Sequence, residues 1–155
     1  MEEGDFKTKI ELVEGYKFRI HFDNEKAGDF YMDEPKPLGT GDYPNAGKFL
    51  AAAVGNCLCA SLTYCVKRHR AEMFSLRAEV YTTLARNDKG RFRITHITVR
   101  LFPEVSDPAV LLRCRDMFED FCIVTASVRN GVPVDVELDG TPVHGQMDLL
   151  SGKEV

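Results

Sequence analysis

Cysteine is the residue type in this chain with the widest chemical potential. The 155-residue sequence contains five of them, Cys57, Cys59, Cys65, Cys114 and Cys122. A cysteine thiolate can act as a nucleophile or bind a metal, whereas a buried cysteine usually serves as a small hydrophobic side chain. Their odd number and irregular spacing argue against a secreted disulfide scaffold. We therefore expect reduced thiols, and because acidic residues rather than a secretory signal follow Met1, we expect a cytoplasmic protein.

The same residue types raise the question of a metal site. Cys57, Cys59 and His69 offer suitable ligand atoms, but cysteines two positions apart on a helix point about 200° away from each other. His69 lies about three helical turns further on, so tetrahedral coordination is not expected. His21 and His96 fall in expected strands and are interpreted as structural or exposed. We therefore expect no metal. We also expect no cofactor, because the sequence lacks a glycine-rich phosphate loop.

The central element among those that must position these thiols is residues 45–70. It carries no charged side chain between Lys48 and Lys67 and contains three of the five cysteines. Apolar or small side chains on nearly every helical face predict a helix that is buried on all sides. The uncharged stretch of 18 residues, 49–66, approaches the roughly 20 residues of a membrane span. Small and polar residues interrupt it and amphipathic strands flank it, so we interpret it as a core helix and expect no membrane association.

Three expected strands precede this helix. Apolar and polar residues alternate in residues 6–13 and again in residues 16–22, which predicts a half-buried antiparallel hairpin. Residues 29–32 form a shorter third strand. The loop 33–44 is rich in proline and glycine, and it leads to Asn45, the expected N-terminal cap of the helix.

A longer hairpin follows the helix. Residues 74–85 alternate in the same way, Asn87–Gly90 has the composition of a tight turn, and residues 91–102 return. The apolar phase of the return strand changes at Thr95–His96, which indicates either a β-bulge or burial on both faces.

The C-terminal part combines a second helix with a last strand. Asp107-Pro108 predicts the start of this helix and Asn130-Gly131 predicts its end, with a break near Cys122. Alternation in residues 132–138 predicts the closing strand. Residues 140–155 are expected to be a loose tail or an edge addition.

The resulting order, β-β-β-α-β-β-α-β, is typical of an α+β domain with a mostly antiparallel sheet. We expect residues 1–155 to form a single domain. One sheet does not cover an all-round apolar helix, so we also expect a homodimer. The net charge of −4 offers no footprint for nucleic acid, and the basic residues at 67–70 are interpreted as stabilising the end of the helix through its dipole.

Two segments carry a family resemblance. FLAAAVGNCLCASL (49–62) resembles the central-helix motif of the OsmC/Ohr family, which commonly reads LLLAALGSCL. FEDFCIVTASVRNGVPVDVEL (118–138) resembles that family's second motif, a cysteine after a helix followed by a short helical stretch and a closing strand. The spacing between Cys57 and Cys122 matches as well. The resemblance covers most of residues 5–139 and implies an OsmC-like fold, with interwoven sheets in a homodimer and active sites where the subunits meet.

The family contains thiol-dependent peroxidases that reduce organic hydroperoxides, so the resemblance implies a role in oxidative stress defence. It implies that Cys57 is the peroxidatic residue, whose thiolate is oxidised to a sulfenic acid. Cys122 would then resolve the sulfenic acid as a disulfide, which requires Cα atoms within about 7 Å. A dithiol reductant, lipoyl-linked or thioredoxin-like, would restore both thiols.

The resemblance also implies an arginine that lowers the pKa of the peroxidatic thiol. Arg19, on the polar face of its strand, is the candidate, although it lacks the family's usual Gly-Arg context and is equally interpretable as a solvated strand residue. The family glutamate that holds this arginine corresponds to Gly47 in this chain. Asp33 or Glu34, in the loop before the helix, could substitute for it.

The composition around the two cysteines suggests an organic substrate. Apolar residues expected near them are Phe49, Leu50, Phe118 and Phe121. Cys59, Cys65 and Cys114 are interpreted as packing residues. An alternative keeps the fold without the redox chemistry, as a binding protein for a hydrophobic or acyl-type ligand in the cleft between subunits. The missing glutamate favours this alternative, whereas the cysteine pair favours the enzyme.

Overall fold

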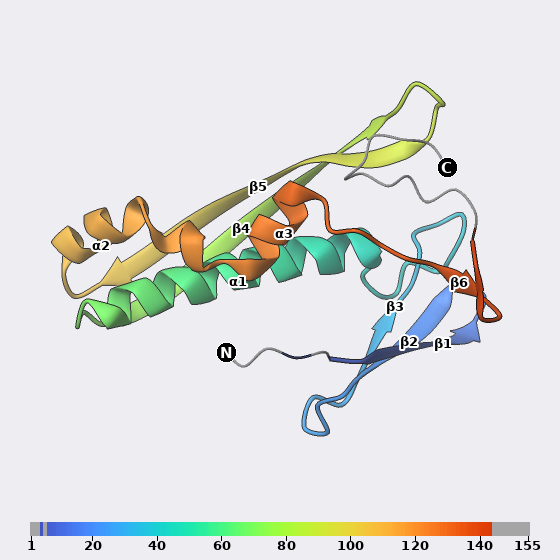
Figure 1. Ribbon diagram of the computed structural model, residues 1–155, viewed down its shortest axis with the longest axis horizontal. Coiled ribbons are helices and arrows are strands. Elements are labelled where there is room, and N and C mark those ends of the chain that lie inside the picture. Colours follow the sequence, from blue (N-terminus) through green and yellow to red (C-terminus); the bar gives the residue numbers. More distant parts are fainter. Residues whose placement is uncertain (1–3, 5, 144–155) are drawn as a thin grey trace.

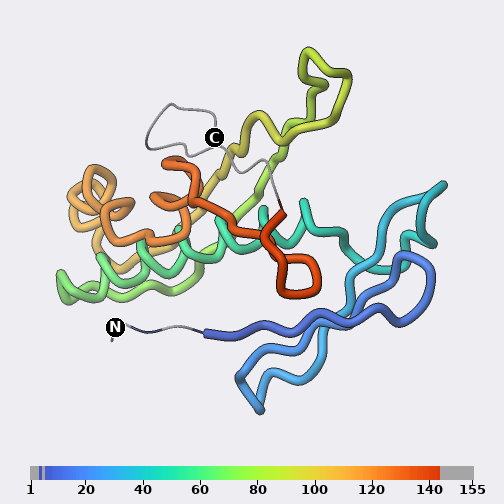
Figure 2. The backbone as a smooth tube through the Cα atoms, turned by 45° about the vertical axis from the view of Figure 1, so that its right-hand side comes forward, coloured from blue at the N-terminus to red at the C-terminus, as the bar shows by residue number. Residues whose placement is uncertain are grey.

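The computed structural model describes residue 4 and residues 6–143, and it confirms the α+β class. Its elements are β1 (Thr8–Glu14), β2 (Lys17–Phe22), β3 (Asp29–Met32), α1 (Ala46–Arg68), β4 (Met73–Arg86), β5 (Phe92–Val105), α2 (Pro108–Arg115), the 3₁₀-helix η1 (Phe118–Phe121), α3 (Ile123–Asn130), β6 (Glu137–Leu138) and β7 (Thr141–Pro142). Figure 1 shows α1 lying along the β4–β5 hairpin, with α2, η1 and α3 folded back along the helix. Figure 2 shows the N-terminal strands β1–β3, in blue, set apart from this body.

Helix α1 starts where the sequence predicts. The Asn45 side chain accepts a hydrogen bond from the backbone N–H of Lys48, with 3.2 Å between the heavy atoms. This cap satisfies one of the free N–H groups of the first turn. Lys67 and Arg68 occupy the last turn, where positive charge is favourable.

The expectation that α1 is buried on all sides does not hold within one chain. By length and composition the helix could cross a membrane, but it packs against β4, β5 and the returning helices, as a core helix does. Its buried side includes Val54, Leu58 and Leu62. Ala53, Asn56, Ala60 and Tyr64, spaced by three or four positions, remain exposed on another side. The second chain that the sequence analysis invokes would have to cover this side.

The β4–β5 hairpin carries the predicted bulge. Thr83 pairs with His96 and Leu84 pairs with Ile94, so Thr95 is an extra residue on β5. This extra residue explains why the apolar phase of the strand changes at this point. On the other strand, Val80 faces Gly55 of α1, where the absence of a side chain allows the helix to approach the sheet closely.

The segment predicted as one second helix forms three shorter helices, α2, η1 and α3. It starts at the expected cap, where the Asp107 carboxylate accepts a hydrogen bond from the backbone N–H of Ala109 at 2.8 Å. It is interrupted after Arg115 and again at Cys122, the N-cap residue that precedes α3, so the expected break is present. Gly131 ends α3 in the left-handed conformation, with φ of 66°.

Two strand predictions need correction. Within residues 132–138 only Glu137–Leu138 form a strand, which pairs with Thr141–Pro142. Within residues 6–143 the strands form a three-stranded sheet and two separate two-stranded sheets rather than one large sheet, and all of β1 is exposed rather than half-buried. A strand also needs a ladder of backbone hydrogen bonds to a neighbouring strand, and the ladder with β7 includes only Glu137 and Leu138. The expected tail beyond residue 143 lies outside the described residues.

The core lies between α1 and the helices that return along it. One buried cluster joins the C-terminal half of α1 to α2 and contains Leu62, Cys65, Val66, Ala71, Val110 and Cys114. A second buried cluster, nearer the middle of α1, contains Val54, Leu58 and Cys122, with Cys57 packed against it. Four of the five cysteines therefore lie at the same interface.

Candidate thiol site between the central and returning helices

Cys57 and Cys122 meet at this interface. Cys57 is half-buried on α1, and Cys122 is 1% exposed at the start of α3. The two thiols are hydrogen-bonded to each other and neither is part of a disulfide. The Cys122 sulfur also contacts the Thr125 hydroxyl at 2.9 Å. The chain therefore brings together two cysteines that the sequence analysis pairs by resemblance, and it leaves only the first with access to solvent.

The electrostatics of the pair favour negative charge on Cys122. Burial raises the pKa of the Cys57 thiol, and its hydrogen bond to Cys122 raises it further. Hydrogen bonds from the backbone N–H groups of Val124 and Thr125 act in the opposite direction but are weaker. Burial also acts to raise the pKa of Cys122, but hydrogen bonds from Cys57, Thr125 and Ser61 outweigh it and lower that pKa. The main causes are burial and hydrogen bonds rather than a neighbouring cation. Because the thiols interact directly, the first proton lost belongs to the pair.

Cys65 and Cys114 are joined by a disulfide, which corrects the expectation of five reduced thiols. Their Cα atoms are 5.8 Å apart, and their exposed fractions are 1% and 0%. Both residues are buried as the apolar pattern predicts, yet they are a cross-link between α1 and α2 rather than independent packing residues. Cys59 is half-buried and free, and burial raises its pKa.

The only potential metal-binding group among the described residues includes this disulfide. The ligand atoms of Cys65, His69 and Cys114 lie within 4.8 Å of one another. With the two sulfurs joined, neither is available as a thiolate, and His69 Nδ1 is hydrogen-bonded to the Cys65 carbonyl oxygen at 2.9 Å. The group therefore does not fit a metal in this state.

Arg19 lies on β2, in the sheet that Figure 2 shows set apart from α1. Its guanidinium is bound to the Glu11 carboxylate, with Nη2 2.5 Å from Oε2, and Nη1 lies 3.9 Å from Asp29. The Arg19 side chain is 45% exposed. Within the described chain, no hydrogen bond or ion pair joins Arg19 to Cys57.

Asp33, one of the two residues expected to substitute for the glutamate, is held by its own loop. Asp33 is buried, and its carboxylate accepts hydrogen bonds from the Thr40 hydroxyl at 2.6 Å and from three backbone N–H groups of its own loop. These bonds, the Thr40 hydroxyl first, lower the pKa of Asp33. Gly47 lies in the first turn of α1, where an added Cβ would meet only ordinary contacts with Asn45 and Ile94.

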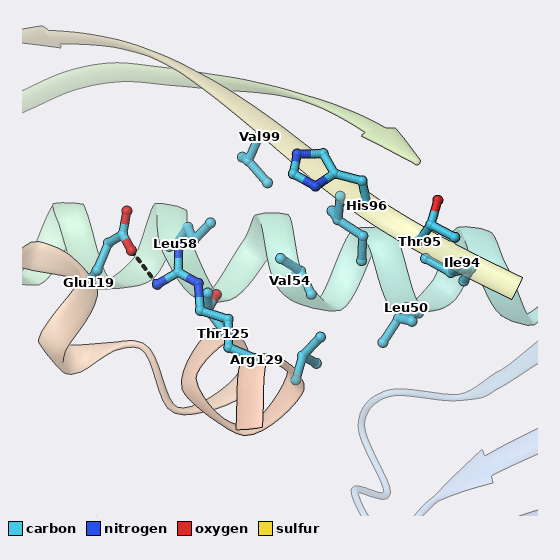
Figure 3. A pocket seen from close by; sticks show the side chains of 12 residues that line it. Leu50, Val54, Leu58, Ile94, Thr95, His96, Val99, Glu119, Thr125 and Arg129 are labelled. Carbon is cyan, nitrogen blue, oxygen red and sulfur yellow. Dashed lines mark hydrogen bonds and ion pairs between the residues drawn. The ribbon is translucent and has the colours of Figure 1, made fainter. Parts of the chain in front are cut away.

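A cavity of about 500 Å³ lies between α1, β5 and α3, and it shares Thr125 with the thiol site. Leu50, Val54 and Leu58 of α1 line it, together with Thr125 and residues of β5. Figure 3 shows Arg129 and Glu119 on one side of this cavity, joined by an ion pair of 2.5 Å, and His96 on the other. The sequence analysis missed this ion pair. The four-residue spacing of Thr125 and Arg129 places both on one face of α3, which indicates that they line one cavity but not that Arg129 pairs with Glu119, ten residues away.

The predicted apolar site residues are distributed over several places. Leu50 lines the cavity, and Phe118 packs against both buried clusters. Phe121 is 38% exposed, and its ring stacks edge-on against Tyr64 with 5.2 Å between the centroids. Phe49 is half-buried on α1.

Comparison with known proteins identifies the family. The OsmC-like protein family model matches residues 39–137, which is more than half of the chain and includes both cysteine motifs. A search of curated proteins finds no match.

Solved structures share the fold at low sequence identity. An OsmC-like protein of unknown function from Vibrio cholerae superposes with a TM-score of 0.70 at 14% identity, covering 81% of this chain and 94% of that one. An OsmC-like protein from Mycoplasma pneumoniae gives 0.70 at 15% identity, with coverages of 84% and 91%. The organic hydroperoxide resistance protein OhrB of Bacillus subtilis gives 0.56 at 18% identity, with coverages of 83% and 93%. The chain belongs to the OsmC-like family.

Proposed function

We propose that this protein is a thiol-dependent peroxidase that reduces organic hydroperoxides through Cys57 and Cys122. The observation that carries the proposal is the direct contact of two free thiols that are 65 positions apart in the chain. Similar structures include proteins named for organic hydroperoxide resistance, which supports the same substrate class and a role in oxidative stress defence.

The exposed fractions favour different roles for the two thiols. Cys57 reaches solvent, so its thiolate attacks the terminal oxygen of R–O–O–H. The O–O bond breaks, the alkoxide takes a proton and leaves as R–OH, and Cys57 becomes a sulfenic acid. The buried Cys122 thiolate then attacks the Cys57 sulfur, the S–OH bond breaks, and the hydroxide leaves as water after taking a proton. The lowered pKa of Cys122 supports this resolving role.

The resulting Cys57–Cys122 disulfide must be reduced before the next cycle. A dithiol of the lipoyl or thioredoxin-like class returns two electrons and two protons to restore both thiols. The apolar lining of the neighbouring cavity, from Leu50, Val54 and Leu58, suits the organic part of a hydroperoxide better than hydrogen peroxide.

We also propose that the working form is a cytoplasmic homodimer. The raised pKa of Cys57 opposes attack at neutral pH, so an efficient peroxidase needs a nearby cation, and within the described chain no hydrogen bond or ion pair joins a cation to Cys57. Arg19 of a second copy is our candidate. β1 has no buried residue, and Ile10 and Leu12 on it are each 62% exposed, which supports a partner over this sheet.

Mass mapping after a single oxidation tests the redox proposal. Protein reduced with a dithiol is freed of reductant, treated with one equivalent of cumene hydroperoxide and alkylated. We expect a Cys57–Cys122 disulfide in the wild type, a trapped sulfenic acid at Cys57 in Cys122→Ser, and no reaction in Cys57→Ser. Cys59→Ser is the matched control, because it removes a neighbouring thiol of α1 and should react like the wild type. Unchanged peroxide consumption in Cys57→Ser would refute the mechanism.

The alternative function is binding of a hydrophobic or acyl-type ligand without redox chemistry. Glycine at position 47 and the apolar side of the cavity, formed by Leu50, Val54 and Leu58, favour it. Free-thiol titration before and after peroxide separates the two functions, because a binding protein would lose no thiol from Cys57 or Cys122.

A further inference from the structure

Two cysteine pairs link α1 to the antiparallel helices that return along it: an outer pair, Cys57 and Cys122, and an inner pair, Cys65 and Cys114. Cys65 lies eight residues after Cys57 on α1, and Cys114 lies eight residues before Cys122 on the returning helices. Cys57 contacts Cys122, and Cys65 is bonded to Cys114. Figure 1 shows α2, η1 and α3 running back along α1, so the inner pair lies nearer the C-terminal end of the helix. The loop closed by Cys65 and Cys114 is thus nested inside the one that Cys57 and Cys122 would close.

The inner disulfide changes the size of the ring that a bond between Cys57 and Cys122 would close. Without the inner cross-link, a Cys57–Cys122 bond closes a ring that spans residues 57–122. With it, the ring passes through the inner disulfide and contains only residues 57–65 and 114–122. For a flexible chain, closure probability falls with the 3/2 power of ring size, so the smaller ring favours contact of the outer thiols by at most about sevenfold, because the packing of α1 against α3 already holds part of this contact in the folded chain.

The surroundings of the inner disulfide suit a lasting bond. Both sulfurs are buried in the cluster formed by α1 and α2, beside Leu62, Val66 and Val110. His69 Nδ1 lies 3.9 Å from each sulfur and donates to the Cys65 carbonyl, so this half-buried ring is held against the disulfide. Exchange requires a thiolate to reach a sulfur atom, and burial restricts that access.

We propose that Cys65 and Cys114 form a persistent disulfide in the working protein and act as positioning residues that hold Cys122 within reach of Cys57. The positioning role rests on the proposed function of the outer pair. The bond forms when a small disulfide such as oxidised glutathione, R–S–S–R, accepts two electrons and two protons from the inner thiols and leaves as two R–SH. The reductant that resets Cys57 and Cys122 leaves the inner bond intact.

Two measurements on the whole chain test the proposal. The first alkylates folded wild-type protein after mild dithiol treatment and maps its peptides by mass. We expect Cys65 and Cys114 linked, and Cys57, Cys59 and Cys122 alkylated. Free thiols at Cys65 and Cys114, or a metal ion bound by them, would overturn the proposal.

The second measurement compares the effective concentration of the outer pair, titrated in glutathione redox buffers, between wild type and the double variant Cys65→Ala/Cys114→Ala. We expect it to fall more than twofold and at most about sevenfold in the variant, while the rate of Cys57 attack on cumene hydroperoxide stays the same. Cys59→Ala is the control and should change neither. An effective concentration within twofold of wild type would overturn the positioning role.

If the double variant does not fold, each single alanine variant, in which the inner bond is equally absent, provides the same comparison. Absence of peroxide attack in the wild type would instead refute the proposed function. It would leave the mapped disulfide and the glutathione titration interpretable, because neither depends on peroxide.

Discussion

Replacing Gly55 with alanine perturbs the contact between α1 and β4 that helps to set the position of Cys57. A Cβ atom at Gly55 would lie 2.6 Å from Val80 Cγ2, whereas non-bonded carbon atoms prefer about 3.5–4.0 Å. The helix must therefore move about 1 Å away from the sheet, or Val80 must leave its rotamer. Overpacking of this kind costs about 1–3 kcal/mol. The higher helix propensity of alanine stabilises the helix by about 1 kcal/mol relative to glycine. We therefore expect Gly55→Ala to lower the free energy of unfolding by about 1 kcal/mol in total.

A double-mutant cycle with Val80→Ala isolates the clash. Val80→Ala alone removes two methyl groups and should cost about 1.5 kcal/mol at this half-buried site. In Gly55→Ala/Val80→Ala the clash is absent, and the gain in helix propensity remains. We expect the double variant to be more stable than the sum of the single effects predicts, by about 1–3 kcal/mol. Urea unfolding followed by circular dichroism measures all four proteins.

The same variants connect this contact to the thiols, because Cys57 follows Gly55 by two residues on the helix. We expect slower Cys57–Cys122 disulfide formation in Gly55→Ala and recovery in the double variant. Additive free energies of unfolding, or a Gly55→Ala protein more stable than the wild type by the full propensity gain, would show that α1 does not approach β4 as closely as described.

Four further predictions concern the remaining features of the site. Loss of the Cys65–Cys114 disulfide, whose residues are 49 positions apart, should lower the free energy of unfolding by about 4 kcal/mol in the alanine double variant, and addition of dithiol should then have no further effect. Because hydrogen bonds lower the pKa of Asp33 below its ordinary value of 3.8, the stability they provide should be complete above about pH 4 and lost as the pH falls through the lower folded-state pKa. Asp33→Asn should abolish that acid dependence in unfolding measured from pH 2 to 6, and an identical profile in the variant would contradict it. Gly47→Glu should raise the free energy of unfolding by about 0.5–1 kcal/mol, because it removes a helical glycine and places a negative charge in the first turn. Peroxidase turnover of this variant should rise only if the new carboxylate binds an arginine, and Gly47→Ala is the control. Arg19→Gln should shift the pH profile of Cys57 alkylation to higher pH, with Lys17→Gln of the same strand as control, and an unshifted profile would exclude Arg19 as the activating cation.

The features that the sequence predicted correctly are those decided by neighbouring residues. Asn45 and Asp107 cap their helices because each side chain bonds to an N–H group only two or three positions ahead. The bulge at Thr95 was visible because one extra residue reverses the side-chain alternation of a strand. Such local patterns need no knowledge of the rest of the fold.

The errors concern contacts between distant parts of the chain. Residues 132–136 alternate like a strand, but regular pairing requires a neighbour that alternation does not specify. Cys65 and Cys114 each fit an apolar stripe, and an apolar stripe says nothing about which buried cysteine faces which. The equal eight-residue offsets from Cys57 and Cys122 become informative only once the returning helices are known to run antiparallel to α1.

The positive charge that would activate Cys57 has two candidate sources, which differ in whether one chain is enough. Arg129 lines the same cavity as Thr125, the residue that contacts Cys122, but it pairs with Glu119 and its side chain is 63% exposed. Arg19 belongs to β2 of the N-terminal sheet and is bound to Glu11, so we expect it to reach a thiol on α1 from a second copy. If Arg19 is the source, dilution into monomers should raise the pH at which Cys57 reacts. If Arg129 is the source, that pH should be independent of protein concentration, and a homodimer would not be needed for the chemistry.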